Sequence, residues 1–315
     1  MINGQLIKRS RLVALGPVLC WLSAAIIVAV CAGLVLYPLI IGAKMVNLEF
    51  LLTDPIPSFN EALAGGILTP IAGTIIIILI ATFVTVPIAL GTAIYLSEYA
   101  NRDSVITKSI SLGVDVLAGV PSAVLAIFGL ILFSLPQLAF LSSKVEGTEL
   151  ALGSSFLVGG LIMMLHIVSF VIKAMEESIR SVPENYRTAA YALGTTRWRV
   201  IRKAVLPAAL PGVITGIILG IGLIAGDTAI ITLCVGGSMT MTGAEQWWLP
   251  WNWLETLQGS GSTLTTFVYY SSPAGEGNAP NKAFGAAFIL ILIVLFLNLT
   301  VDYIMAKSKK VKAAA

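Results

Sequence analysis

Glu184-Asn-Tyr-Arg-Thr-Ala-Ala-Tyr-Ala-Leu-Gly194 is a polar segment in a chain that is otherwise strongly apolar. Pro183, just before it, suits the first turn of a helix, where the N–H that proline lacks would be unpaired anyway. Gly194 suits the left-handed residue that ends a helix. The segment therefore predicts a short helix that faces water.

One side of this predicted helix is apolar and narrow. Tyr186, Ala189, Ala190 and Leu193 follow the spacing i, i+3, i+4, i+7. So short a helix is not stable alone in water. We therefore expect it to be docked on its own protein, on the lipid surface or on a partner, and we interpret it as the handle by which another protein moves this one.

The composition indicates a membrane protein that is all-α. Of its 315 residues, 57% are hydrophobic and only 11% are charged, and the mean hydropathy is +0.94. No soluble domain has this balance, and the apolar runs lack the alternation of barrel strands. Roughly 20 residues of helix cross a bilayer, so six segments are long enough to span it. They are residues 12–41, 70–96, 109–135, 151–172, 211–235 and 284–304.

Alternate connections between these segments hold most of the basic residues. The richer set comprises Lys8, Arg9, Arg11, Arg102, Lys108, Lys173, Arg180, Arg187, Arg197, Arg199, Arg202, Lys203, Lys307, Lys309, Lys310 and Lys312. The other connections hold Lys44, Lys144 and Lys282. By the positive-inside rule, both termini and the 184–194 segment are cytoplasmic. Because the basic residues are dispersed over separate connections, they indicate membrane topology rather than a nucleic-acid-binding surface.

Two acidic residues fall inside predicted spans, where an ionisable group is a functional-site hypothesis by default. Asp115 precedes Gly119-Val-Pro-Ser122 in the third span; it either belongs to a substrate path or merely caps a helix or contacts a basic residue. Asp227-Thr228 lies in the glycine-rich fifth span. Because no predicted span holds an Arg or Lys in its interior, a cationic partner for Asp227 must come from another chain.

The remaining reactive residues predict no catalysis and no metal site. His166 is the only histidine. To act in a proton relay it would need a titratable neighbour at the same depth in the membrane. Because the one candidate, Asp227, is expected nearer the outer side, we favour a packing role for His166. The three cysteines, Cys20, Cys31 and Cys234, lack paired spacing and are interpreted as small core residues. Four tryptophans between residues 247 and 253 mark either an interface belt or a docking site.

The polar segment, followed by Leu206-Pro207, resembles the cytoplasmic signature loop of ABC importer permeases. That pattern has Glu-Ala-Ala, three residues and Gly; here Thr188 replaces the Glu, while Ala189, Ala190 and Gly194 match. Three further stretches are similar to the PstA-type permease subunits of phosphate importers. They are Pro87-Ile-Ala-Leu-Gly-Thr-Ala-Ile-Tyr-Leu-Ser-Glu-Tyr99, Asp115-Val-Leu-Ala-Gly-Val-Pro-Ser122 and Phe267-Val-Tyr-Tyr-Ser-Ser-Pro-Ala-Gly-Glu-Gly-Asn278.

The resemblance implies a type I permease bundle of six helices in the inner membrane. It implies an anchor helix and outer loop in residues 1–69, the transport domain in 70–304 and a basic tail in 305–315. The expected partners are lipid, a second related permease, two ATP-binding subunits and an external phosphate-binding protein. The ATPase-coupling residues would be Glu184, Tyr186, Arg187, Ala189, Ala190, Leu193 and Gly194.

ATP and Mg would be held by the partner subunits, since this chain has no Gly-Lys-Ser/Thr phosphate loop and we expect no cofactor in it. Asp227, Thr228, Asp115 and Ser122 would line the substrate path or pair the two permeases. Asp227 would either meet an Arg of the partner or accept a hydrogen bond from protonated phosphate, which sulfate cannot offer. The family commonly has an Arg where Leu223 stands, which removes a cation from this path.

Three other functions remain open at this stage. The chain could be a permease for another oxyanion. A secondary transporter would need ion ligands in broken helices and a repeated hydropathy pattern, neither of which is clear here. A membrane scaffold that senses phosphate without moving it would also use the cytoplasmic helix.

Overall fold

The computed structural model describes residues 2–56, 58, 61, 64–101, 103–144, 150–237, 241–243, 246–275 and 277–313, with the backbone alone for 2–15, 274, 301–302 and 304–313. Within these ranges the chain is helical and contains no strand beyond two isolated bridges, so the predicted all-α architecture is confirmed. Arg102, Glu276 and the side chains of the terminal cations, which entered the sequence-based predictions, lie outside the described residues.

The long helices are α1 (Ile2–Ala43), α3 (Leu68–Ile94), α4 (Val105–Ala118), α5 (Ser122–Phe133), α6 (Phe156–Arg180), α9 (Leu206–Gly226) and α13 (Pro280–Ala313). The short helices are α2 (Leu48–Leu52), α7 (Glu184–Ala192), α8 (Arg197–Val200), α10 (Ala229–Cys234), α11 (Trp253–Gln258) and α12 (Leu264–Ser271). Single turns complete the order: η2 (Tyr95–Tyr99), η3 (Ala139–Leu141), η4 (Ile201–Val205), η5 (Pro250–Asn252) and η6 (Pro273–Gly275).

The core forms where α6 packs between α3 and α9. Phe156, Ile162 and Met163 of α6 are fully buried there, against Ile77 of α3 and other apolar side chains. Small residues permit this close packing, as is common between membrane helices: a side chain at Gly160 would collide with Ile80. Helix α6 is therefore the centre of the bundle.

Five helices are long and apolar enough to cross a membrane, and the bent pair α4–α5 makes a sixth candidate. The predicted third span is thus corrected: its two helices are bent by 101°, because the chain breaks at Gly119-Val-Pro121 and Pro121 is the N-cap residue of α5. The fifth span is corrected too. It starts at Arg197, runs through η4 and α9, and ends at Gly226, where Asp227 interrupts it.

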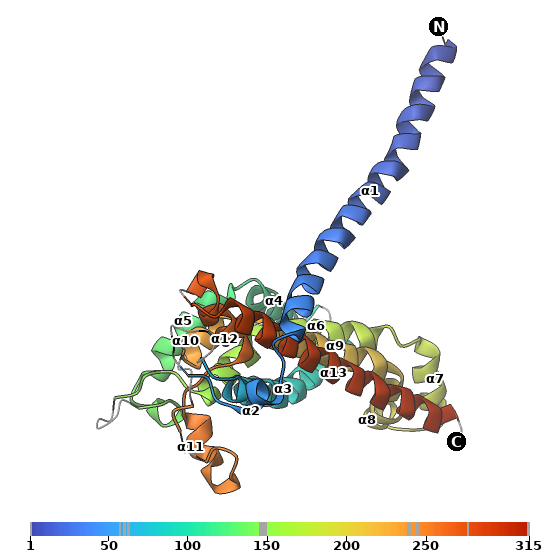
Figure 1. Ribbon diagram of the computed structural model, residues 1–315. Helices are drawn as coiled ribbons and strands as arrows, with labels where there is room; N and C mark the ends of the chain where they lie inside the picture. Colours follow the sequence, from blue (N-terminus) through green and yellow to red (C-terminus); the bar gives the residue numbers. More distant parts are fainter. Residues whose placement is uncertain are drawn as a thin grey trace.

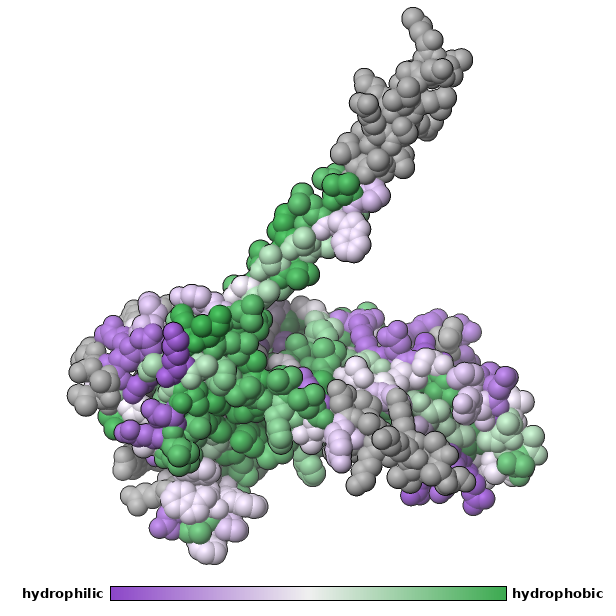
Figure 2. Space-filling view, turned by 45° about the vertical axis from the view of Figure 1, so that its right-hand side comes forward, coloured by the Kyte–Doolittle hydropathy of each residue, from purple (hydrophilic) through white to green (hydrophobic). Residues whose placement is uncertain are grey.

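Helix α1 leads away from the rest of the chain and meets it mainly where its C-terminal end packs on α13 (Figure 1). Its spanning segment, Gly16–Ala43, has no buried residue in its most apolar window. Figure 2 shows an apolar band across the body, with polar residues gathered toward both ends. This distribution suits a body surrounded by lipid at its middle.

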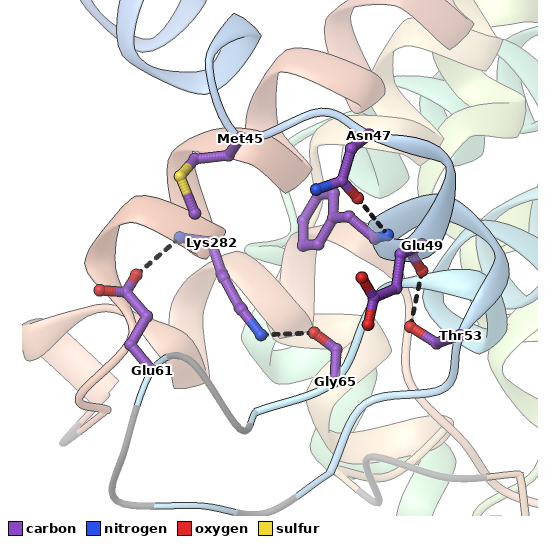
Figure 3. Close-up of a pocket in the computed structure, with 8 residues that line it drawn as sticks. Met45, Asn47, Glu49, Thr53, Glu61, Gly65 and Lys282 are labelled. Atoms are coloured by element: carbon purple, nitrogen blue, oxygen red, sulfur yellow. Dashed lines mark hydrogen bonds between the residues drawn. The ribbon is translucent and has the colours of Figure 1, made fainter.

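A polar clamp ties the first long connection to the start of α13 (Figure 3). Glu61 accepts hydrogen bonds from the backbone N–H of Lys282 at 3.0 Å and from the amide of Asn281 at 3.1 Å. The buried ammonium of Lys282 donates to the carbonyl of Gly65 at 2.6 Å. Gly65 has φ +64°, a conformation that favours glycine. The clamp fixes the loop beside the last span.

Candidate functional site

Helix α7 protrudes at one end of the molecule, close to α8 and to the end of α13 (Figure 1). Helices α10 and α11 lie at the opposite end. Helix α7 runs from Glu184 to Ala192 with Pro183 as its N-cap residue. Gly194 follows with φ +70°. The short helix and its left-handed glycine are therefore present as predicted.

The predicted apolar face of α7 is covered by the rest of the protein on one side and exposed to solvent on the other. Ala190 is partly buried and packs against the core beneath α7. Tyr186 and Leu193 are 53% and 82% exposed, and Ala189 is also exposed. Apolar side chains that protrude together from so short a helix form a surface that a partner can cover. The helix is thus attached along one edge and open along the other.

Arg187 attaches α7 to the end of α3. Its guanidinium donates to Glu98 of η2, with Nη2 at 2.6 Å and Nε at 3.1 Å from Oε1. It also donates to the carbonyls of Val182 and Ile179. The hydrogen bond to Glu98 raises the pKa of Arg187 although burial opposes this, so the guanidinium stays charged. This bidentate geometry is the strong form of the Arg–carboxylate pair.

Glu184 and Arg197 add weaker contacts around the same attachment. Glu184 lies in the first turn of α7, largely exposed, with Oε2 3.5 Å from Nη1 of Arg187. The guanidinium of Arg197, at the start of α8, lies 4.7 Å from the ring centroid of Tyr99 in η2. Helices α7 and α8 therefore both hold the π-helical turn that ends α3.

The second candidate region is the break after α9, where Asp227 and Thr228 lie between two helices. One oxygen of Asp227 accepts the N–H of Ile230 at 2.7 Å, and the carbonyl of Thr228 accepts that of Thr232, so both residues start α10. The other oxygen of Asp227 lies 3.9 Å from Nε2 of His166 in α6. The expected separation of these groups in depth was wrong, because His166 of the same chain faces the carboxylate of Asp227.

Asp115 belongs to a different pair. Its carboxylate lies 2.6 Å from Nζ of Lys173, with both side chains about half exposed. Helix α6 continues to Arg180, so Lys173 lies within a spanning helix; the expectation that no span holds a cation inside it was wrong. Ser122 starts α5 on the far side of the bend from Asp115. The four predicted path residues therefore lie in three places: Asp115 in α4, Ser122 at the start of α5, and the adjacent Asp227 and Thr228 after α9.

Sequence reasoning missed Glu98, Lys173 and the role of His166. Glu98 had a signal, since it is an acidic residue at the end of a long apolar run. Lys173 was placed in a loop because the predicted fourth span ended at residue 172, whereas α6 continues to Arg180. His166 had none, because its contact with Asp227 depends on where α9 breaks.

Known proteins resemble this chain in both sequence and fold. A family model described as the binding-protein-dependent transport system inner membrane component matches residues 86–310. The probable ABC transporter permease protein YqgI of Bacillus subtilis is 28% identical, covering 90% of this chain and 91% of that protein. The phosphate transport system permease protein PstA 1 of Mycobacterium tuberculosis is 34% identical, covering 76% of this chain and 70% of that one.

A solved structure shares the fold. The bacterial alginate ABC transporter, crystallised with an alginate-bound periplasmic protein, contains a chain that matches 90% of this one with a TM-score of 0.56. The match covers 95% of that chain at 16% sequence identity. At this identity the likeness supports the arrangement of helices alone.

Proposed function

Because the chain belongs to the binding-protein-dependent transport family of inner membrane components and is an ABC importer permease, we propose that it imports phosphate. The phosphate permease of Mycobacterium tuberculosis supports this substrate, as do the three stretches that resemble phosphate permeases. The relative YqgI is named only as an ABC permease, so the substrate needs its own test.

The observation that best supports coupling to an ATP-binding subunit is the exposed position of α7 at one end of the molecule. Tyr186 and Leu193 protrude from a short helix whose other edge is fixed by Arg187. A partner that covers this apolar edge can push on the helix without detaching it. We assign that place to a cytoplasmic ATP-binding subunit, with Glu184, Ala189, Ala190 and Gly194 completing the surface.

The basic residues orient the chain. Lys173, Arg187, Arg199 and Lys203 lie on or near the α7 end, so the positive-inside rule places this end in the cytoplasm. Both termini would lie on the same side. Residues 1–69 would then supply an anchor and an outer loop, residues 70–304 the transport domain, and residues 305–315 a cytoplasmic tail.

Movement of α7 would reach the spans through Glu98. Closure of the ATP-binding subunits on ATP would displace α7, and the Arg187–Glu98 pair would carry that displacement into η2 and α3. Because α3 packs along α6 and α9, a shift of its end rocks the core between inward-open and outward-open states. The chain itself would break no bond.

The complete transporter would contain a second related permease, two ATP-binding subunits and an external phosphate-binding protein. Uptake of radiolabelled phosphate by vesicles that contain all of them tests the proposal. We expect uptake only with ATP inside. Uptake driven by an ion gradient without ATP would indicate a secondary transporter, binding without uptake a sensing scaffold, and uptake of another oxyanion in place of phosphate a different substrate.

A further inference from the structure

Three basic side chains follow one face of α6. His166, Lys173 and Arg180 are seven residues apart, and two turns of helix separate each from the next by roughly 10 Å. The His166 side chain is 18% exposed, whereas those of Lys173 and Arg180, nearer the α7 end, are 49% and 45% exposed. Ionisable residues within a spanning helix are candidates for a functional site.

Each of these three side chains has an acidic neighbour, but the first pair differs from the other two. Nζ of Lys173 lies 2.6 Å from Asp115, and Nη2 of Arg180 lies 2.7 Å from Glu176, so both are direct contacts. Nε2 of His166 is 3.9 Å from Asp227, which is too far for a hydrogen bond. A polar atom of a third group can therefore bridge them.

Both members of the open pair keep unused hydrogen-bonding capacity. One oxygen of Asp227 is occupied by the N–H of Ile230, while the other faces His166. The His166 ring lies with its centroid 6.2 Å from that of Phe170, at an interplanar angle of 67°. The two side chains are 18% and 10% exposed, so both keep some accessible surface.

The surroundings of the pair are otherwise free of described charges. Helices α3, α5, α9 and α10, which pack on α6, contain no charged residue. The charged residues of the other neighbours are Lys108 and Asp115 in α4, Glu98 in η2 and Glu255 in α11, and those of α6 itself are Lys173, Glu176, Glu177 and Arg180. The pair lies near the middle of α6, where a broken backbone is tolerated only beside protein or a wet cavity.

We propose that His166 and Asp227 together bind a protonated oxyanion during its passage, and that this pair selects phosphate. The imidazole N–H donates to an anionic oxygen of the ligand, and the free oxygen of Asp227 accepts the P–OH proton. Sulfate has no proton to offer, so it leaves the carboxylate facing an anionic oxygen. This inference rests on the proposed phosphate transport and names the residues that carry its specificity.

The test uses the complete transporter in nanodiscs without its external binding protein, so that binding to the permeases alone is measured. Equilibrium dialysis with radiolabelled phosphate gives the affinity, and unlabelled sulfate is the competitor. The variants are His166→Gln, His166→Lys and Asp227→Asn. Ser169→Ala is the matched control, since Ser169 lies one turn along α6 and its buried hydroxyl has no partner among the described residues.

We expect His166→Gln to weaken phosphate binding at least tenfold and His166→Lys to restore most of it. Asp227→Asn is expected to keep phosphate binding while sulfate competes at least tenfold better, because the amide can donate to either anion. Ser169→Ala is expected to match the unchanged protein. Uptake in vesicles with the binding protein present is expected to follow the same order.

Two results would overturn the inference while phosphate transport stands. In one, the unchanged transporter moves phosphate and His166→Gln binds and moves it equally well. In the other, His166→Gln and His166→Lys both fail to assemble whereas Ser169→Ala assembles, which makes the pair a brace between α6 and the break after α9. If the unchanged transporter moves no phosphate, the proposed function itself is wrong.

Discussion

The ion pair of Arg187 and Glu98 attaches α7 to the end of α3, and a single substitution can remove it. Both side chains are buried, at 12% and 6% exposure. Glu98→Ala leaves the guanidinium without its carboxylate, which typically costs about 3 kcal/mol or more. We expect a lower thermal midpoint of the purified chain in detergent and loss of ATP-driven uptake.

The matched control replaces both partners. In Glu98→Leu with Arg187→Met no charge is left buried, so stability is expected to recover toward that of the unchanged chain. Uptake is expected to remain low, because apolar contacts do not fix α7 in one orientation. Equal stability of Glu98→Ala and the unchanged chain would show that the ion pair does not stabilise the fold.

Gly194 tests the end of the same helix without changing its packing. Its φ is +70°, yet a Cβ there would meet no atom within 4 Å. The cost of a side chain is therefore conformational, on the order of 1 kcal/mol, and Asn tolerates the left-handed region better than most residues. We expect Gly194→Val to reduce co-purification of the ATP-binding subunit and uptake, and Gly194→Asn to preserve both.

Normal co-purification and uptake with Gly194→Val would contradict the assignment of α7 as the coupling helix. Ala189→Trp provides a second, independent obstruction, since Ala189 is exposed on the open edge of α7. It changes the docking surface and leaves the backbone at Gly194 as it is.

At the scale of elements, the clamp between residues 61–65 and α13 joins parts of the chain that are far apart in sequence. Lys282→Met keeps the apolar stem but removes the donor to Gly65, which leaves a carbonyl without its partner. An unpaired buried group costs about 1–3 kcal/mol. We expect a lower thermal midpoint for Lys282→Met and for Glu61→Ala.

Lys44 is exposed, so its substitution serves as the control for loss of a positive charge. Lys44→Met is expected to leave the thermal midpoint unchanged. If Lys282→Met behaves in the same way, the clamp does not stabilise the fold.

The sequence predicted the elements better than their junctions. Hydropathy located the apolar segments because each depends only on a run of neighbouring residues. The bend at Pro121 and the break at Asp227 lie inside apolar runs. Glycine and proline in such runs are compatible with either a straight helix or a broken one, so the sequence alone did not predict the breaks. The partners Glu98 and Arg187 are 89 residues apart, so only the folded chain, which brings α7 to η2, places them together.

At the scale of the whole molecule, two polar ends are separated by an apolar band (Figure 2). The segment Arg197–Gly226 is 30 residues long, or roughly 45 Å as a helix, which exceeds the hydrocarbon thickness of roughly 30 Å. A helix of this length can extend beyond the hydrocarbon at the α7 end. Leu193 in this region and Trp251 at the other end are 82% and 76% exposed, which makes them suitable reporters.

With the three native cysteines replaced, we expect a membrane-impermeant maleimide to label Leu193→Cys only in inside-out vesicles and Trp251→Cys only in intact spheroplasts. Assembly with the ATP-binding subunits should protect Leu193→Cys several-fold and leave Trp251→Cys unaffected, because only the α7 end is covered. Labelling of Leu193→Cys from outside would reverse the orientation and remove α7 from the reach of ATP. Labelling from inside without protection would keep the orientation but place the ATP-binding subunit elsewhere.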